Sequence, residues 1–128
     1  METNSNKARV CIAGATGWAG SALARGIVKT DDMELVAAIS RSHAGKILGE
    51  AIGVKGLVAP VFGTVDEALA TRPDVFVEYT KPEAAKFHAL SALKSGAHVV
   101  IGTSGLGAED YEEIDRAAQE VKRGVLAV

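Results

Sequence analysis

The chain has 128 residues, the length of one compact domain, and 48% of them are hydrophobic, enough to bury a core. Its 14 Lys and Arg residues and 16 Asp and Glu residues are scattered and give a net charge of −2, so we expect no basic surface for nucleic acid. No apolar stretch is long enough to cross a membrane, the single cysteine cannot form an internal disulfide, and the first six residues are polar without a signal segment, so we expect a cytoplasmic protein.

Strand-like and helix-like patterns alternate along the first half of the chain. Residues 9–13 are expected to form an apolar strand and residues 17–29 an amphipathic helix. Residues 34–40 form an almost continuous apolar run, which is typical of a strand buried on both faces of a parallel sheet. Glycines recur so often between 41 and 63 that we expect a long loop there, with one turn of helix at most.

The alternation continues through the second half. We expect helix 66–70, strand 73–77, helix 82–95, strand 98–101, helix 108–122 and strand 125–128. Pro82 suits the start of a helix because its missing N–H would have no partner there, and Gly96 ends that helix. Apolar side chains at helical spacing are expected to face the core: Ala19, Leu23, Ile27, Phe87, Leu90 and Leu93.

The strongest motif lies in the turn after the first strand, where residues 14–20 read Gly-Ala-Thr-Gly-Trp-Ala-Gly. Gly14 allows a tight turn, Gly17 lets the backbone approach a pyrophosphate, and Gly20 permits close packing of helix on sheet. The free N–H groups at the start of the helix and the positive end of its dipole favour an anion. The motif predicts a dinucleotide site, and a glycine-rich turn kept for packing alone is the alternative.

These patterns predict the α/β class, with a doubly wound parallel sheet of five strands and a Rossmann-like NAD(P)-binding fold in a single domain. Ligands of such sheets bind beyond the carboxyl ends of the strands, where the strand order reverses. Three segments are expected to converge there, namely residues 14–20, 79–80 and 102–105.

The end of the second strand bears on the choice of dinucleotide. Domains that prefer NAD usually carry Asp or Glu there to bind the ribose hydroxyls, whereas this chain has Ser40 and Arg41. Serine can donate to a 2′-phosphate and arginine can hold it through two charge-assisted hydrogen bonds. We therefore predict NADPH over NADH, the alternative being that Arg41 is an ordinary surface residue. Trp18 can stack near the adenine end or merely cover the turn.

Taken together, three motifs resemble the nucleotide-binding half of the 4-hydroxy-tetrahydrodipicolinate reductases, also called dihydrodipicolinate reductases. They are the glycine turn, Glu-Tyr-Thr-Lys-Pro-Glu at 78–83 and Val-Ile-Gly-Thr-Ser-Gly-Leu at 100–106. The resemblance implies an NAD(P)H-dependent oxidoreductase of the diaminopimelate route to lysine. Such an enzyme transfers a hydride to a cyclic unsaturated dicarboxylate, with NADPH or NADH as the cofactor.

The resemblance also implies where the cofactor binds. The expected cofactor-binding residues are Gly14, Ala15, Thr16, Gly17, Trp18, Ala19, Ser40, Arg41, Tyr79, Thr80, Gly102, Thr103, Ser104 and Ala127. Thr103 and Ser104 are expected to lie beside the substrate as well. The family usually has Arg-Met in place of Trp18-Ala19, so a cation near the phosphates is missing, while Glu78 for Asp and Ser104 for Thr keep the functional group.

No catalytic residue is expected in this chain. In the family, the substrate-binding residues, the proton-donating His/Lys cluster and the contacts of a tetramer lie in a second domain after the fifth strand. His43, His88 and His98 are expected to be structural, and with Cys11 they form no metal site. We therefore expect residues 1–128 to be the dinucleotide-binding domain of a longer enzyme that forms a homo-oligomer through the missing domain.

Two other functions remain open at this point. A glycine turn followed by an aromatic residue also occurs in acyl-phosphate reductases, but those need a catalytic cysteine after the nucleotide-binding strands, and Cys11 lies in the first strand. A nucleotide-sensing module without catalysis has the same fold. The Gly-Thr-Ser-Gly loop at 102–105 argues against a sensor, because a sensor of adenine nucleotides need not organise the nicotinamide end.

Overall fold

The computed structural model describes residues 7–128. Its elements are β1 (Ala8–Ala13), α1 (Trp18–Val28), β2 (Met33–Ile39), α2 (Leu48–Ile52), β3 (Val61–Phe62), α3 (Val65–Leu69), β4 (Val75–Glu78), α4 (Pro82–Ser95), β5 (His98–Ile101), α5 (Ala108–Val121) and β6 (Val125–Ala127). The polar N-terminal segment, for which the sequence predicts no signal function, lies outside the described residues.

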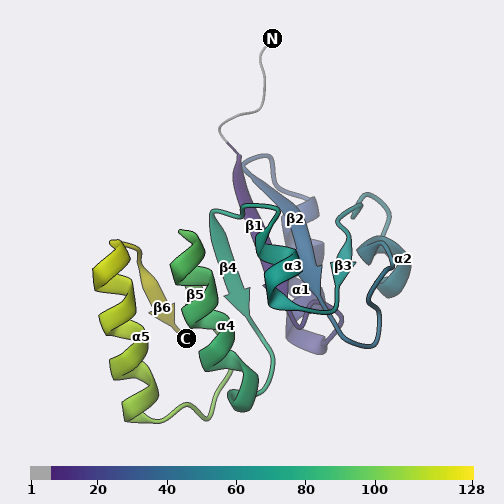
Figure 1. Cartoon of the computed structure of the whole chain (residues 1–128). Coiled ribbons are helices and arrows are strands. Elements are labelled where there is room, and N and C mark those ends of the chain that lie inside the picture. The colour runs from purple at the N-terminus through teal and green to yellow at the C-terminus, as the bar shows by residue number, and fades with distance from the viewer. Residues whose placement is uncertain (1–6) are drawn as a thin grey trace.

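The strands form one parallel sheet in the order β3-β2-β1-β4-β5-β6 (Figure 1). The chain starts in the middle of the sheet, builds outward to β3, and then returns to β4 and builds outward on the other side. The strand order therefore reverses between β1 and β4, which makes their carboxyl ends the place where such sheets bind ligands. The doubly wound α/β fold is confirmed, whereas the expectation of five strands is wrong.

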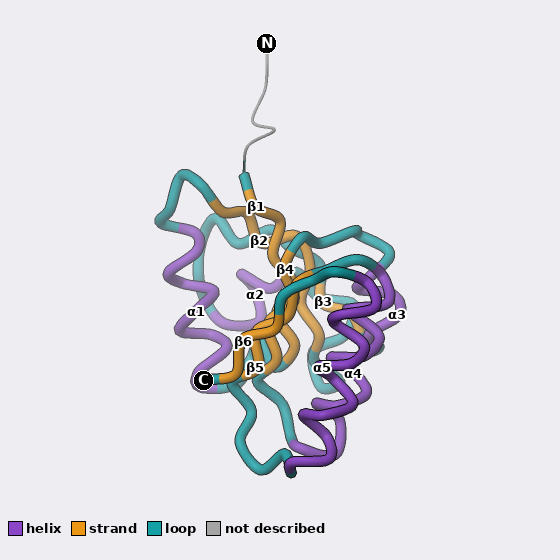
Figure 2. The backbone as a smooth tube through the Cα atoms, turned by 90° about the vertical axis from the view of Figure 1, so that its left-hand side faces the viewer, coloured by secondary structure: helices purple, strands orange, loops and turns teal. Residues whose placement is uncertain are grey.

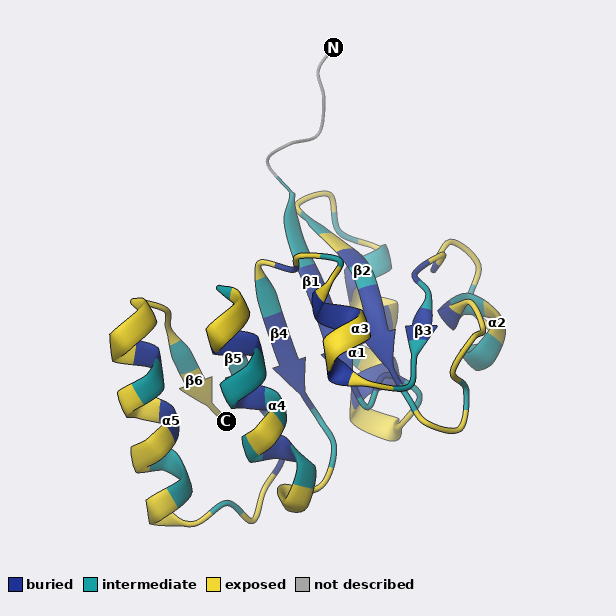
Figure 3. Ribbon diagram, in the orientation of Figure 1, coloured by how far each residue is buried: buried dark blue, intermediate teal, exposed yellow. Residues whose placement is uncertain are grey.

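Helices cover both faces of the sheet. Seen along the sheet in Figure 2, α1 lies on one side and α3, α4 and α5 lie on the other. The side chains of β1 alternate between two apolar cores: Val10 and Ile12 pack with α1 and α2, and Cys11 and Ala13 pack with the other three helices. Buried residues follow the strands and the inner helix faces, as Figure 3 shows.

The stretch from 41 to 63 is more ordered than the expected loop. It contains the single turn of helix, α2, and also β3, which the sequence pattern missed. The amide of Ser40 donates to the carbonyl of Phe62 at 3.0 Å, so β3 extends the sheet beside the end of β2. Two residues between a proline and a glycine are too short to show the alternation that identifies a strand.

Two expected helix faces are wrong in part. Ala19 is exposed, and α1 instead buries Gly20, Ser21, Ala24 and Ile27. Phe87 is 60% exposed, because the buried face of α4 consists mainly of alanines, together with Leu93. Small residues let a helix lie close to the sheet, so the larger apolar side chains stand at the rim of the contact.

Gly20 and Gly26 give a matched test of the contact between α1 and the sheet. A Cβ on Gly20 would overlap the backbone carbonyl of Gly14, whereas a Cβ on Gly26 would meet nothing within 4 Å. We expect Gly20→Ala to lower the free energy of unfolding by about 1–3 kcal/mol through overpacking. Gly26→Ala should raise it by about 0.5–1 kcal/mol, because alanine loses less backbone entropy. Urea unfolding followed by circular dichroism measures both, and equal changes would contradict the close contact.

Cys11 provides a test of core integrity. Burial raises the pKa of its thiol from 9.0 to about 12, and the negative charge of Glu78 adds to the rise. The folded protein therefore keeps a proton that the unfolded chain releases, so the free energy of unfolding should fall between about pH 9 and pH 12. Cys11→Ala should lose this part of the pH dependence. At about pH 8 the thiol should react with Ellman's reagent only after unfolding, and labelling at the rate of a free thiol in native buffer would refute its burial.

Candidate functional site

The three segments singled out in the sequence meet at the carboxyl edge of the sheet. The amide of Tyr79 donates to the carbonyl of Ala13 at 2.9 Å, and the amide of Gly102 donates to the carbonyl of Glu78 at 2.9 Å. The ends of β1, β4 and β5 are therefore tied side by side. A Cβ on Gly14 would overlap the carbonyl of Tyr79, so this junction accepts only glycine at that position.

The glycine turn leaves the start of α1 open. Gly14 has a φ of +83°, which favours glycine, and its carbonyl accepts the amide of Gly17 at 3.0 Å. Gly17 is the N-cap of α1 and supplies no side chain to cap the helix, and the first turn carries no acidic residue. The first N–H groups of α1 therefore stay available at the positive end of the helix dipole. This geometry suits an anion such as a pyrophosphate.

Trp18 and Ala19 lie on the outer side of this turn, and both are exposed. Trp18 is 95% exposed, although it is a large hydrophobic residue. An exposed aromatic ring beside an anion site is a surface on which a base can stack.

Hydroxyl groups gather at the end of β2. The Thr16 and Ser40 hydroxyls share a hydrogen bond of 3.0 Å, which links the glycine turn to β2. Ser42 lies 3.3 Å from the Ser40 hydroxyl, and the Nδ1 of His43 lies 2.9 Å from the Ser42 hydroxyl. Arg41 is exposed, and no carboxylate among residues 7–128 pairs with it. The surface here combines hydroxyl donors with a cation that is free to meet an anion.

The opposite end of the edge is held by a buried network. The carboxylate of Glu78 accepts the amide of Thr80 at 3.0 Å and the hydroxyl of Thr80. The Thr103 hydroxyl donates to the carbonyl of Glu78 at 3.2 Å and lies 2.9 Å from the amide of Thr80. The hydroxyls of Thr80 and Thr103 are thus engaged inside the protein. These hydrogen bonds tie the ends of β4 and β5 together at this edge.

Three further predicted site residues, Gly102, Ser104 and Ala127, lie near these two threonines. The Tyr79 ring covers Gly102 so closely that a Cβ on this glycine would overlap it. Ser104 is exposed in the loop that follows β5. Ala127 is exposed in β6 and pairs with Ile101 near the same edge.

The three histidines lie in different places. His98 begins β5 at the amino edge of the sheet and accepts the amide of Gly124 at 2.9 Å. His43 lies at the end of β2, as described above. The Nδ1 of His88 in α4 lies 2.8 Å from Glu78, a pairing that the sequence analysis missed because ten residues of chain separate the two side chains. The one available signal was an acidic residue at the end of an apolar strand.

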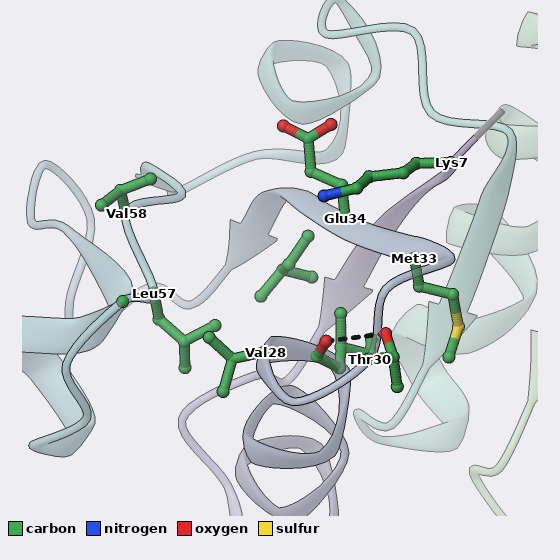
Figure 4. A pocket seen from close by; sticks show the side chains of 10 residues that line it. Lys7, Val28, Thr30, Met33, Glu34, Leu57 and Val58 are labelled. Carbon is green, nitrogen blue, oxygen red and sulfur yellow. Dashed lines mark hydrogen bonds between the residues drawn. The ribbon is translucent and has the colours of Figure 1, made fainter. Parts of the chain in front are cut away.

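A recess of about 270 Å³ lies at the opposite, amino-terminal end of the sheet. Figure 4 shows Lys7, Thr30, Glu34 and Val58 among the residues around it. None of the predicted site residues lines it. In the part of the chain from 7 to 128, no group of three or more His, Cys, Asp or Glu side chains could hold a metal ion, and no helix is long and apolar enough to span a membrane.

Solved structures show the same fold. A dipicolinate-bound dihydrodipicolinate reductase from Paenisporosarcina sp. TG-14 superposes with a TM-score of 0.81 at 28% identity, over 95% of this chain and 47% of that chain. The WlbA dehydrogenase from Chromobacterium violaceum, in complex with NADH and UDP-GlcNAcA, has a TM-score of 0.81 at 22% identity over 96% of this chain and 35% of that one. The biliverdin reductase of Synechocystis sp., in complex with biliverdin and NADP⁺, has a TM-score of 0.76 at 21% identity over 93% and 37%. The last two establish only the Rossmann-like NAD-binding fold.

Curated relatives agree with the motifs. The chain is 37% identical over 123 residues to the 4-hydroxy-tetrahydrodipicolinate reductase of Syntrophomonas wolfei, covering 95% of this chain and 46% of the relative. It is 36% identical over 119 residues to the enzyme of the same name from Geobacillus kaustophilus, covering 92% and 45%. The chain thus spans about half the length of these relatives. The matches favour this family over the acyl-phosphate reductases.

A family model described as "Dihydrodipicolinate reductase, N-terminus" matches residues 8–127, almost the whole chain. The resemblance drawn from the three motifs is thereby confirmed. The chain therefore belongs to the dihydrodipicolinate reductase family, and it matches the N-terminal, nucleotide-binding part of that family.

Proposed function

We propose that this chain binds NAD(P)H for a reductase that transfers a hydride to a cyclic unsaturated dicarboxylate, the reaction of the 4-hydroxy-tetrahydrodipicolinate reductases in lysine biosynthesis. The observation that carries the proposal is the open, uncapped and acid-free start of α1 above the Gly14 turn, at the point where the strand order reverses. Family membership supports the reductase, and the dipicolinate in the solved relative supports a dicarboxylate substrate.

In this proposal the edge of the sheet holds the dinucleotide along its length. The turn at 14–19 binds the pyrophosphate, and Ser40 and Arg41 bind the 2′-phosphate of NADPH, which is preferred over NADH. Thr80 and Thr103 fix the edge at the other end and line the nicotinamide site together with Tyr79, Gly102, Ser104 and Ala127. Bound there, the cofactor supplies the hydride. The chain's own contribution is to orient the ring.

The proton donor and the substrate-binding groups belong, in this proposal, to a second domain that also forms the oligomer. The histidines of residues 7–128 support this division of roles, because none of them stands free at the proposed nicotinamide end. His88 is engaged by Glu78, His98 lies at the opposite edge, and His43 lies beside Ser42. We expect this chain alone to bind cofactor in the cytoplasm without turning over substrate.

The loop at 102–105 supports a reductase over a nucleotide sensor. Gly102 receives the Tyr79 ring, and Gly105 has a φ of +100° and packs against Pro82. This ordered backbone shapes the end of the site that a sensor of adenine nucleotides does not need.

The cofactor preference can be tested at Arg41. We expect the chain to bind NADPH more tightly than NADH in calorimetric titrations. Arg41→Ala should weaken NADPH binding by about tenfold, because a charge-assisted hydrogen bond is worth about 1.5–3 kcal/mol, and should change NADH binding by less than about twofold. Arg116→Ala, an equal change of charge on the exposed face of α5, is the control. Equal losses for both nucleotides, or tighter NADH binding by the parent chain, would reject the assignment.

The anion site can be separated from stability at Gly17. Its extended backbone, with φ −76° and ψ 179°, accepts an N-cap aspartate. Gly17→Asp should leave the stability of α1 within about 0.5 kcal/mol, because the carboxylate accepts the free N–H groups and offsets the tight 3.3 Å approach of the new Cβ to the carbonyl oxygen of Gly14. It should also weaken dinucleotide binding by at least about tenfold, because that carboxylate occupies and repels the phosphate position.

Gly107→Asp is the matched control, since Gly107 is the N-cap of α5 and is also extended, with φ −88° and ψ 173°. It adds the same charge at a different helix and should leave affinity within about twofold. Thermal unfolding and calorimetry report the two effects. Unchanged affinity in Gly17→Asp would exclude the start of α1 as the phosphate site.

A further inference from the structure

A buried glutamate and a histidine contact each other beside the proposed nicotinamide end. The side chain of Glu78, the last residue of β4, is 0% exposed, and that of His88, in the middle of α4, is 14% exposed. Carboxylates are rarely buried, because removal from water is costly unless hydrogen bonds compensate. The proposed cofactor contacts do not use this pair, so its presence at this point needs another explanation.

The two carboxylate oxygens have separate roles. Oε1 lies 2.8 Å from the Nδ1 of His88, and Oε2 receives both the amide and the hydroxyl of Thr80. Each carboxylate oxygen therefore has its own hydrogen-bonding partner, one in α4 and one in the segment after β4. With Oε1 held by His88, the carboxylate is oriented so that Oε2 faces Thr80.

His88 is itself held in place from the side. Its ring stands edge-on to Phe76, with the ring centroids 6.1 Å apart and the planes at 70°. Phe76 is fully buried in the sheet beneath α4. Of the other titratable groups, Cys11 in β1 is close enough to Glu78 for the carboxylate to help raise the pKa of its thiol. That thiol keeps its proton near neutral pH, and no charged group among residues 7–128 other than Glu78 contributes to the rise.

Thr80 links the Glu78–His88 pair to the residues of the proposed site. It directly follows Tyr79, whose carbonyl lies so close to Gly14, and whose ring lies so close to Gly102, that neither glycine has room for a Cβ. The amide of Thr80 also meets the Thr103 hydroxyl at 2.9 Å, which fixes the loop after β5. The Glu78 carboxylate thus holds Thr80 on one side, and Thr80 together with the backbone carbonyl of Glu78 holds Thr103 on the other.

We infer that Glu78 and His88 are positioning residues that fix Tyr79 and Thr80 before any dinucleotide arrives, so that the nicotinamide end meets a preformed surface. The inference rests on the proposed function, and neither side chain touches the ligand. Because a preformed site spares the cost of ordering groups on binding, loss of the pair should weaken contacts at the nicotinamide end and leave the adenosine end unchanged.

The test compares two probes on this chain: NADPH, and 2′-phospho-ADP-ribose, which lacks the nicotinamide. For His88→Gln and Glu78→Gln we expect NADPH affinity to fall by about threefold to tenfold, the cost of ordering one or two more groups, with the fragment within about twofold. The fluorescence of the reduced nicotinamide should show a less rigid ring in the variants at saturating ligand. His98→Gln, which removes a hydrogen-bonded histidine at the far edge, should change neither affinity. Circular dichroism verifies folding, and His88→Gln decides alone if Glu78→Gln does not fold.

The outcomes distinguish the two proposals. If the parent chain binds neither probe, the proposed function fails and the inference fails with it. If the parent binds both probes and the variants lose both equally, or lose neither, the proposed function stands and the positioning role is overturned. A selective loss of NADPH together with the altered fluorescence supports the role.

Discussion

The close approach of Gly14 to the carbonyl of Tyr79 sets the geometry of the whole carboxyl edge. Because no Cβ separates them, the end of β1 lies directly against the end of β4, and the start of α1 faces the gap where the strand order reverses. Six residues later, Gly20 makes a second close contact of this kind, against the carbonyl of Gly14. Glycine is needed at both positions for space, and at Gly14 also for its positive φ. This junction sets the positions of three features: the amino end of α1, the hydroxyl groups near Ser40 and the hydrogen bonds around Thr80.

The sequence predicts much of this fold because its longer elements carry strong signals. The ranges 82–95 and 98–101 match the structure to the residue, since a proline, a glycine and an unbroken apolar run mark their ends. The failures have a common physical origin. β3 is too short to show the alternation of apolar and polar residues, and its pairing depends on backbone hydrogen bonds that leave no trace in the side-chain pattern. Phe87 was misplaced because a run of alanines, which looks weakly apolar, forms the contact of α4 with the sheet.

The position of the candidate site was also predictable from the sequence, but its internal hydrogen bonds were not. Spacing and family motifs located the three segments, and the structure brings them together at one edge. The sequence pattern alone could not predict which polar side chains form hydrogen bonds with one another inside the protein. The Thr80 and Thr103 hydroxyls are engaged by Glu78, and His88 completes that network from a different element. Such links depend on which way a strand's last side chain points and on the helix packed over it, both of which are decided only by the folded chain.

The exposure of the indole at the start of α1 has an optical consequence. Trp18 is the chain's one tryptophan and is surrounded by water in the native state. Its emission therefore resembles that of an unfolded chain and says little about denaturation. Because it stands beside the turn where a coenzyme would lie, and because a reduced pyridine ring absorbs where indole emits, the same residue is a built-in donor for energy transfer. The fluorescence of Trp18 therefore reports poorly on unfolding and well on the binding of a reduced coenzyme.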